Sequence, residues 1–429
     1  MTPWPDMKVG RVARLISGVG FPHQYQGKTS GAHPFLKVSD LSSTVSGYRL
    51  VTAQNWVSQA DLASLGARLV PKGAILFPKV GAAMLKNPRR LLDLPAAMDN
   101  NLMAVVPNSG EPRFWLYALS TIDLGEISAG GVLPYVNEGQ IRDLHIPFPS
   151  VEQQRRIADF LDVETARIDR IHDLRSRQQT LLKEAAIRRV YDAVRGAHVK
   201  GERKESGLDW LGTVPANWRV GAVSHYFEVE LGKMLNQERA QGDFLRPYLR
   251  VANVQWDQID VTDLSMMDFP PEEQARYRLR PGDLLVNEGG SWPGRAAVWT
   301  GEISEIYYQK ALHRIRARGH ELTRWLYYCL VAAERLRVFQ TQGNTSTMTH
   351  LTREQLRPQR FPFPEVSTQA RLVAELNRAA TRDAEMKRLL NRQLDLLAER
   401  RQALITAAVT GQFEVSTASG RNVTEGVSA

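Results

Sequence analysis

The chain has 429 residues, and 43% of them are hydrophobic, so it can bury more than one core and exceeds the usual size of a single domain. Lysine and arginine total 55 against 46 acidic residues, which gives a formal net charge of +9 and makes a polyanion a reasonable partner. The single cysteine, Cys329, excludes an internal disulfide framework, and no cysteine or histidine cluster has the short spacing of a zinc site.

The first residues, MTPWPDMKVGRVARL, contain no apolar signal core. No run of the sequence approaches the roughly 18 apolar residues that a membrane span needs. We therefore expect a protein of the reducing cytoplasm that holds no metal and does not enter a membrane.

Residues 1–149 contain short apolar runs bounded by glycine and proline. LVPKGAILF, which starts at Leu69, is typical of a turn that leads into a short buried strand. These runs predict a first domain of mixed helix and sheet over residues 1–149.

Residues 150–197 carry apolar side chains that recur every seven residues, which is typical of a long helix with one apolar seam. Pro149 blocks helix on its N-terminal side, SVEQ from Ser150 can form a capping box, and Gly196 suits the left-handed position after the last turn. About 45 residues at 1.5 Å each give a rod of roughly 65 Å. The predicted seam consists of Ile157, Leu161, Ile168, Ile171 and Leu182.

The same phrases return in the second half of the chain. HIPFPSVEQQRRIADFL, from His145, returns as RFPFPEVSTQARLVAEL, from Arg360, so the two PFP motifs lie 215 residues apart. The repeat predicts a second domain over 198–364, a second helix over 365–412 and a flexible tail over 413–429. The offset of 215 pairs identical residues without a gap, among them Gln154 with Gln369, Arg156 with Arg371, and Gly196 with Gly411. The second seam consists of Leu372, Leu376, Met386, Leu390 and Leu397.

The domains before the helices repeat more loosely. FLKVSDL, from Phe35, resembles YLRVANV, from Tyr248, at an offset of 213, and FWLYAL, from Phe114, resembles RWLYYC, from Arg324, at an offset of 210. LVPKGAILF resembles LRPGDLLV, from Leu279, in the same way. Because the offset drifts, the loops of the two copies differ in length, and the chain is a tandem duplication.

Two helices of equal length and one register favour a helix pair over two separate amphipathic helices, which is the alternative for one isolated helix. Polar seam residues such as Gln178 and Asp383 indicate a specified register. A duplicated unit packs on its own copy most simply about a local two-fold axis, so we expect the helices to be antiparallel. The predicted fold is α+β, a tandem repeat of two α/β domains separated by two long antiparallel helices that form a coiled coil with pseudo-two-fold symmetry.

Four phrases together resemble the specificity subunit of type I restriction-modification enzymes: PFPSVEQQRRIADFLDVETARIDRI, its second copy PFPEVSTQARLVAEL, GLDWLGTVPANW before the second domain, and LITAAVTGQ at the end of the second helix. The resemblance covers nearly the whole chain and is strongest in the helices. It implies two target recognition domains, each of which reads one half of a bipartite, asymmetric DNA target. The helices would then set the spacer between the half-sites.

The resemblance also implies a subunit without catalytic activity and with bound partners. These are double-stranded DNA, two methyltransferase subunits and, in a restricting enzyme, two restriction subunits. This chain would bind no cofactor, because S-adenosylmethionine is expected on the methyltransferase, and ATP and magnesium on a nuclease or translocase partner.

The sequence lacks the motifs of those partners. No glycine-rich loop ends in Gly-Lys-Ser/Thr to hold ATP phosphates, and no Asn/Asp-Pro-Pro-aromatic motif of an adenine methyltransferase is present. GDLLVNEGG places Asp283 near Glu288 but lacks the lysine of a nuclease site, so we interpret it as a turn and a strand.

Basic and amide side chains in loops after predicted strands are the candidates for DNA contact, because such loops on a rigid scaffold suit phosphate and base edges. The alternative for each is a solvated surface loop. In the first domain the candidates are Lys79, Lys86, Arg89 and Arg90, and in the second they are Asn287, Trp292, Arg295, Gln309, Lys310, His313, Asn344, Thr345 and Ser346.

Two other functions stay open at this point. A coiled-coil structural adaptor would explain the helices but not two large basic domains. A stand-alone restriction-modification enzyme would need a catalytic site of a kind that the sequence does not display.

Overall fold

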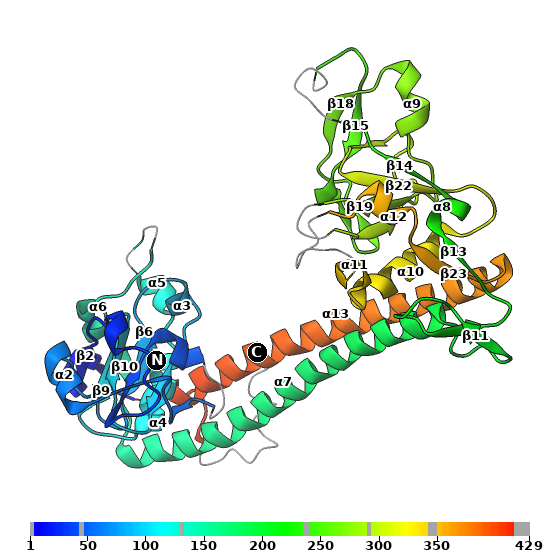
Figure 1. The fold of residues 1–429 in the computed structure, drawn as a ribbon. Coiled ribbons are helices and arrows are strands. Elements are labelled where there is room, and N and C mark those ends of the chain that lie inside the picture. Colours follow the sequence, from blue (N-terminus) through cyan, green and yellow to red (C-terminus); the bar gives the residue numbers. More distant parts are fainter. Residues whose placement is uncertain are drawn as a thin grey trace. The chain divides into compact units, whose positions relative to one another are not determined.

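The computed structural model describes residues 4–42, 47–128, 130, 133–234, 241–289, 293–341 and 350–415. It forms two compact units, Met1–Ser176 with Asn391–Ala429, and Arg177–Leu390 (Figure 1). Each unit contains one domain and the adjoining parts of both long helices, so the division falls within the helices. No helix in the described ranges is long and apolar enough to span a membrane.

The first unit is built on two sheets. The five-stranded sheet has the order β2-β9-β6-β7-β4, and the three-stranded sheet has the order β5-β3-β8. The strands are β2 (Ala13–Ser17), β3 (His33–Leu36), β4 (Arg49–Leu50), β5 (Asn55–Val57), β6 (Ile75–Pro78), β7 (Arg90–Leu92), β8 (Ala97–Met98) and β9 (Leu102–Pro107). The helices of this domain are α1 (Val9–Val12), α2 (Gln59–Leu65), α3 (Ala82–Leu85), α4 (Pro112–Ser120), α5 (Leu124–Ile127) and α6 (Glu138–Asp143).

The second unit repeats this topology, except that its described residues contain no counterpart of β4. Its sheets have the orders β14-β22-β19-β20 and β18-β15-β21, in which each strand takes the place of its counterpart in the first unit. The strands are β14 (Phe227–Leu231), β15 (Leu245–Leu249), β18 (Ser265–Asp268), β19 (Leu284–Asn287), β20 (Ala296–Val298), β21 (Tyr307–Tyr308) and β22 (Leu312–Ala317), with the pairs β11 (Arg203–Glu205) and β12 (Thr213–Pro215), and β16 (Val254–Gln255) and β17 (Gln258–Ile259). The helices are α8 (Val223–Tyr226), α9 (Pro271–Tyr277), α10 (Thr323–Arg335), α11 (Val338–Thr341) and α12 (Arg353–Leu356). The predicted duplication is therefore confirmed in the domains as well as in the helices.

The repeated PFP phrase closes each domain. In the first unit β10 (His145–Pro147) pairs antiparallel with β1 (Asp6–Lys8), and in the second β23 (Arg360–Phe363) pairs antiparallel with β13 (Arg219–Ala222). The long helix begins directly after each motif. The motif therefore returns the end of the domain to its beginning before the helix starts.

A glycine at the same place in each copy allows two chain segments to cross. A Cβ atom at Gly18 would lie 1.9 Å from the carbonyl oxygen of Asp99, and one at Gly232 would lie 2.2 Å from that of Gln309. No side chain fits at such distances, so both positions require glycine.

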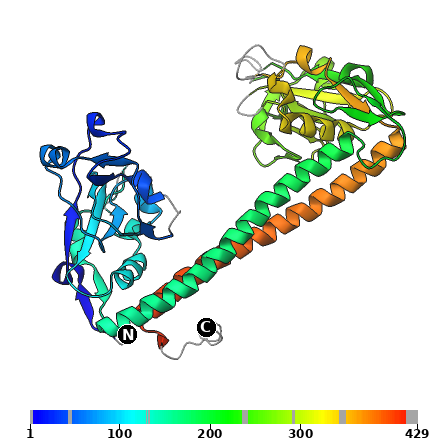
Figure 2. The same cartoon turned by 60° about the horizontal axis from the view of Figure 1, so that its bottom comes forward.

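The long helices are α7 (Val151–Val194) and α13 (Val366–Thr410). Within each unit their adjoining parts run side by side in opposite directions (Figures 1 and 2). The ion pairs Asp169–Arg401, at 2.9 Å in the first unit, and Arg189–Asp383, at 2.6 Å in the second, show the antiparallel order. Gly196 has a positive φ of 64° after α7, as predicted.

Each domain core takes in the start of one long helix and the end of the other. The first core contains Ile157, Leu161, Ile405 and Val409, and the second contains Val194, Leu372 and Leu376. Ile157 and Leu372, Leu161 and Leu376, and Val194 and Val409 are all pairs at the offset of 215. The two copies therefore bury equivalent helix positions.

The predicted seam is correct at most positions and wrong at one equivalent pair. Ile157, Leu161, Ile168, Leu372, Leu376 and Leu390 are buried, and Leu182 and Leu397 are half-buried. Ile171 and Met386, which are equivalent positions, are 38% and 43% exposed. They lie two heptads after Ile157 and Leu372, whereas Leu390, two heptads after Leu376, stays buried.

Candidate nucleic-acid interface and partner surface

Lys79 and Lys86 follow β6 and remain surface candidates for DNA contact. The Lys79 ammonium lies 3.3 Å from the hydroxyl oxygen of Ser17, on the wall of a pocket of about 380 Å³. Lys86, at the end of α3, is exposed. Tyr135 lines the same pocket as Lys79 and is 46% exposed.

Arg89, in contrast, is buried, so the prediction that it contacts DNA was wrong. The side chain is only 5% exposed, and its guanidinium donates hydrogen bonds to the carbonyl oxygens of Pro88 and Ile122. It lies 5.1 Å from the ring centre of Phe77, and burial lowers its pKa to about 10. Arg89 therefore joins elements within the domain.

Arg90 points to a different region from Lys79. Its guanidinium donates to the carbonyl oxygen of Arg89, and burial, together with the charge of Arg401, lowers its pKa. It lines a pocket of about 860 Å³ with residues of both long helices, among them Asp169 and Arg401. The adjacent arginines at 89 and 90 thus serve different parts of the first unit.

Two candidates of the second domain are also buried. Asn287 is 1% exposed, and its amide nitrogen lies 3.5 Å and 3.4 Å from the carbonyl oxygens of Val251 and Val254. His313 is fully buried, its Nε2 lies 2.8 Å from the carbonyl oxygen of Leu351, and burial lowers its pKa. Neither side chain can reach DNA in this conformation, so both expectations are corrected.

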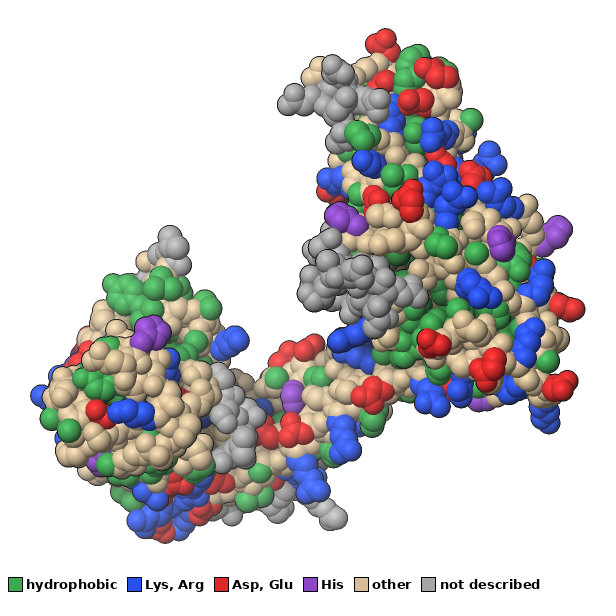
Figure 3. Space-filling view, in the orientation of Figure 1, with side chains coloured by type: hydrophobic (Ala, Val, Ile, Leu, Met, Phe, Trp, Pro, Cys, Tyr) green, Lys and Arg blue, Asp and Glu red, His purple; other side chains and the backbone are tan. Residues whose placement is uncertain are grey.

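The other candidates of the second domain differ in exposure, and some lie outside the described residues. Lys310 is exposed and Gln309 is half-buried beside it. Arg295 contacts the side-chain oxygen of Gln255. The predicted residues Trp292, Asn344, Thr345 and Ser346 lie outside the described residues. On the face shown in Figure 3, basic side chains of this unit are scattered among acidic and hydrophobic ones.

The long helices carry a second kind of surface. Large hydrophobic side chains are exposed at equivalent positions of the two helices. The pairs and their exposed fractions are Ile171 and Met386 (38% and 43%), Leu174 and Leu389 (60% and 44%), and Leu181 and Leu396 (54% and 51%). Each unit thus presents three of these side chains from its own part of the helix pair.

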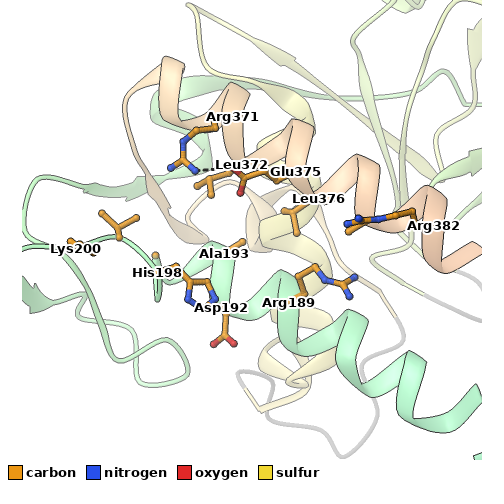
Figure 4. A pocket seen from close by; sticks show the side chains of 13 residues that line it. Arg189, Asp192, Ala193, His198, Lys200, Arg371, Leu372, Glu375, Leu376 and Arg382 are labelled. Carbon is orange, nitrogen blue, oxygen red and sulfur yellow. Dashed lines mark hydrogen bonds and ion pairs between the residues drawn. The ribbon is translucent and has the colours of Figure 1, made fainter. Parts of the chain in front are cut away.

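A pocket also recurs where the start of one helix meets the end of the other. In the second unit, 13 residues line a pocket of about 480 Å³, with Arg371 and Leu372 on α13 opposite Ala193 on α7 (Figure 4). In the first unit, a pocket of about 350 Å³ is lined by the equivalent residues, Arg156, Ile157 and Ala408. The two linings share seven equivalent positions, and the residue is identical at three of them: Arg156 and Arg371, Ala408 and Ala193, and Gly411 and Gly196. Among the positions that differ, His198 in the second unit corresponds to Phe413 in the first.

Phe413 packs edge-on against Phe160, with ring centres 5.6 Å apart. In the sequence, the only sign of these pockets is the set of identical residues at the offset of 215. The seven-residue pattern did not show which hydrophobic side chains of the helices would be exposed.

Comparison with solved structures defines the class of fold. A chain from a structure of complex assembly and conformational transition of the type I R-M system has a TM-score of 0.71 and 19% identity, and covers 96% of this chain and 100% of that chain. The HsdS subunit from Thermoanaerobacter tengcongensis has a TM-score of 0.54 and 18% identity, over 96% of this chain and 97% of that chain. The fold is that of type I specificity subunits.

The sequence comparisons find similarity to proteins of the same kind. Residues 1–178 match the family model of the type I restriction modification DNA specificity domain. The type I restriction enzyme MjaIX specificity subunit of Methanocaldococcus jannaschii is 21% identical over 62% of this chain. The EcoKI specificity subunit of Escherichia coli K12 is 21% identical over 68% of this chain. The match spans 62% of the length of each of these two relatives. The resemblance predicted from the sequence is confirmed: the chain is similar in sequence to specificity subunits of type I restriction-modification enzymes.

Proposed function

We propose that this chain is the sequence-specific DNA-binding subunit of a type I restriction-modification enzyme. Each domain reads one half of a bipartite, asymmetric DNA target, and the helix pair sets the spacer between the half-sites. One observation carries this proposal: the second domain follows the strand order of the first, but the residues of the two domains differ in the loops after these strands. Two domains with the same strand order and different side chains can recognise two different half-sites.

The proposed partners are two methyltransferase subunits and, in a restricting enzyme, two restriction subunits. The exposed hydrophobic pairs and the paired pockets support two copies of one partner, because identical partners need equivalent surfaces. Catalysis belongs to these partners. S-adenosylmethionine is held by the methyltransferase, and ATP and magnesium by the nuclease or translocase.

A salt titration of DNA binding separates this function from that of a structural adaptor. The full chain with a type I methyltransferase subunit of the same organism should lose DNA affinity steeply as salt rises, because phosphate contacts release counterions. An adaptor would show no such loss. A methylation assay separates it from a stand-alone enzyme, since the chain alone should transfer no methyl group and the complex should. Methylation by the isolated chain would refute the proposal.

A further inference from the structure

The two domains share one backbone frame at the end of the strand that precedes the candidate loops. In each domain the first residue after β6 or β19 is held by two backbone hydrogen bonds. They run from Lys79 N to Asn101 O (2.8 Å) and from Val136 N to Lys79 O (2.9 Å) in the first domain, and from Glu288 N to Ala311 O (3.0 Å) and from Leu351 N to Glu288 O (2.6 Å) in the second. Lys79 and Glu288 are therefore structural equivalents, although their charges are opposite.

Side chains around this frame differ at four equivalent positions. Strand register fixes the correspondence, because Ser17 is opposite Met103 just as Leu231 is opposite His313. The four equivalent pairs are Ser17 and Leu231, Lys79 and Glu288, Met103 and His313, and Tyr135 and His350. In the first domain all four residues line the pocket of about 380 Å³.

The helix-end pockets behave in the opposite way. There the duplication preserves part of the lining, because Arg156 is matched by Arg371, Ala408 by Ala193 and Gly411 by Gly196. Surfaces that bind two copies of one partner should stay alike in a duplicated chain, whereas surfaces that read two different half-sites should diverge. This contrast rests on the proposed function. It indicates that the side chains that differ around the shared frame contact DNA.

We propose that Lys79 and Tyr135 in the first domain, and Glu288 and His350 in the second, are specificity-determining residues that contact bases of their own half-site. Lysine donates to O6 and N7 of guanine, and a carboxylate accepts from N4 of cytosine. A carboxylate is repelled by phosphates, so Glu288 contributes to binding through a base and not through the backbone.

Within the described residues, each of these four side chains is at least partly exposed. Among the described residues, the carboxylate of Glu288 makes no hydrogen bond or ion pair, although it is half-buried. Tyr135 is 46% exposed and Leu133, which lines the same pocket, is 61% exposed, so both offer apolar surface beside the Lys79 ammonium. His350 is exposed and lies against Gly289, where an added Cβ atom would come within 2.6 Å of the His350 Nδ1.

The test is a selection from a duplex library with a randomised segment, using the full chain with its methyltransferase subunit. Glu288→Lys and Glu288→Gln are compared with the wild type, as is Lys79→Glu. Glu272→Lys is the charge control in the second domain, because Glu272 is exposed on α9. Arg68→Glu, at an exposed position between α2 and β6, is the control in the first.

Both Glu288 variants should lower the preference for cytosine at one position of the second half-site by roughly tenfold or more. At that position the Glu288→Lys variant should prefer guanine, and the Glu288→Gln variant should prefer adenine. The first half-site should not change. Lys79→Glu should alter the first half-site alone, and the controls should alter neither. Unchanged half-sites in the Glu288 and Lys79 variants would overturn this inference while the proposed function stands. A wild-type complex that selects no sequence would overturn the proposed function, and the inference with it.

Discussion

Gln154 and Gln369 lie 215 positions apart, are both fully buried, and make the same two hydrogen bonds. The amide nitrogen of Gln154 donates to the carbonyl oxygen of Pro149 (2.9 Å), and its Oε1 accepts from the backbone N–H of Glu111 (2.9 Å). Gln369 does the same with Pro364 (2.8 Å) and Leu322 (3.1 Å). Each glutamine thus joins the PFP motif and a domain helix to the first turn of a long helix.

The first prediction concerns these glutamines. Gln369→Ala leaves a buried carbonyl and a buried N–H without partners, so we expect the free energy of unfolding to fall by about 1–3 kcal/mol. Gln258→Ala, at an exposed position of the same unit, should change it by less than about 0.5 kcal/mol. Urea denaturation followed by circular dichroism measures both, and equal stability of the two variants would contradict the assigned role.

The second prediction is a loss of stability at alkaline pH. Burial and a hydrogen bond to Asp162 raise the pKa of Tyr48 to about 12, and burial and a hydrogen bond to Glu305 raise the pKa of Tyr307 to about 12. The unfolded phenols ionise near pH 10, so the folded state holds the protons longer, and stability falls as pH rises from about 10 to 12.

Urea midpoints at pH 9, 10 and 11 measure this fall. In Tyr48→Phe the fall should be shallower, because phenylalanine has no proton to lose. A Tyr48→Phe variant with the same pH dependence as the wild type would show that Tyr48 is not responsible.

The third prediction concerns the helix pair as a ruler. Four residues inserted after Gln178 and four after Gln393 lengthen both helices by about 6 Å, close to the rise of two base pairs at roughly 3.4 Å each. A matched insertion in both helices is required because the ion pairs Asp169–Arg401 and Arg189–Asp383 join the helices in both units. The spacer between methylated half-sites should grow while their sequences stay the same, and an unchanged spacer in an active variant would refute the ruler.

The fourth prediction concerns residues 1 to about 200 as a separate fragment. The end of α13 contributes Leu404, Ile405, Ala408 and Val409 to the first core, so the fragment leaves that surface uncovered. In a two-fold dimer of fragments, residues 190, 193 and 194 of the second copy can replace 405, 408 and 409, since all six are valine, isoleucine or alanine. The dimer should recognise an interrupted palindrome built from the first half-site.

Arg189 should weaken that dimer, because it would occupy the position of the buried Leu404. Arg189→Leu should therefore tighten the dimer, which sedimentation equilibrium can measure. A folded monomer, or a dimer that still selects the asymmetric target, would contradict this account of the repeat.

The repeat, the long helices and the family resemblance were predictable because each depends on residue spacing over many positions. Single side chains were not. Arg89 and Arg90 are adjacent, and only the packing against Phe77 shows that Arg89 is buried. Asn287 was expected on a loop, but it ends strand β19 and faces inward. Glu288 drew attention only as a poor catalytic candidate, because its equivalence to Lys79 is a matter of strand register.

The central claim, that two diverged domains read two different half-sites, is tested most directly by mapping methylated sites in cells with and without this gene. The account predicts methylation that depends on the gene at one bipartite, asymmetric sequence, with two defined half-sites and a spacer of fixed length and no preferred sequence. Methylation that is unchanged without the gene, or that falls on one continuous or symmetric sequence, would contradict it.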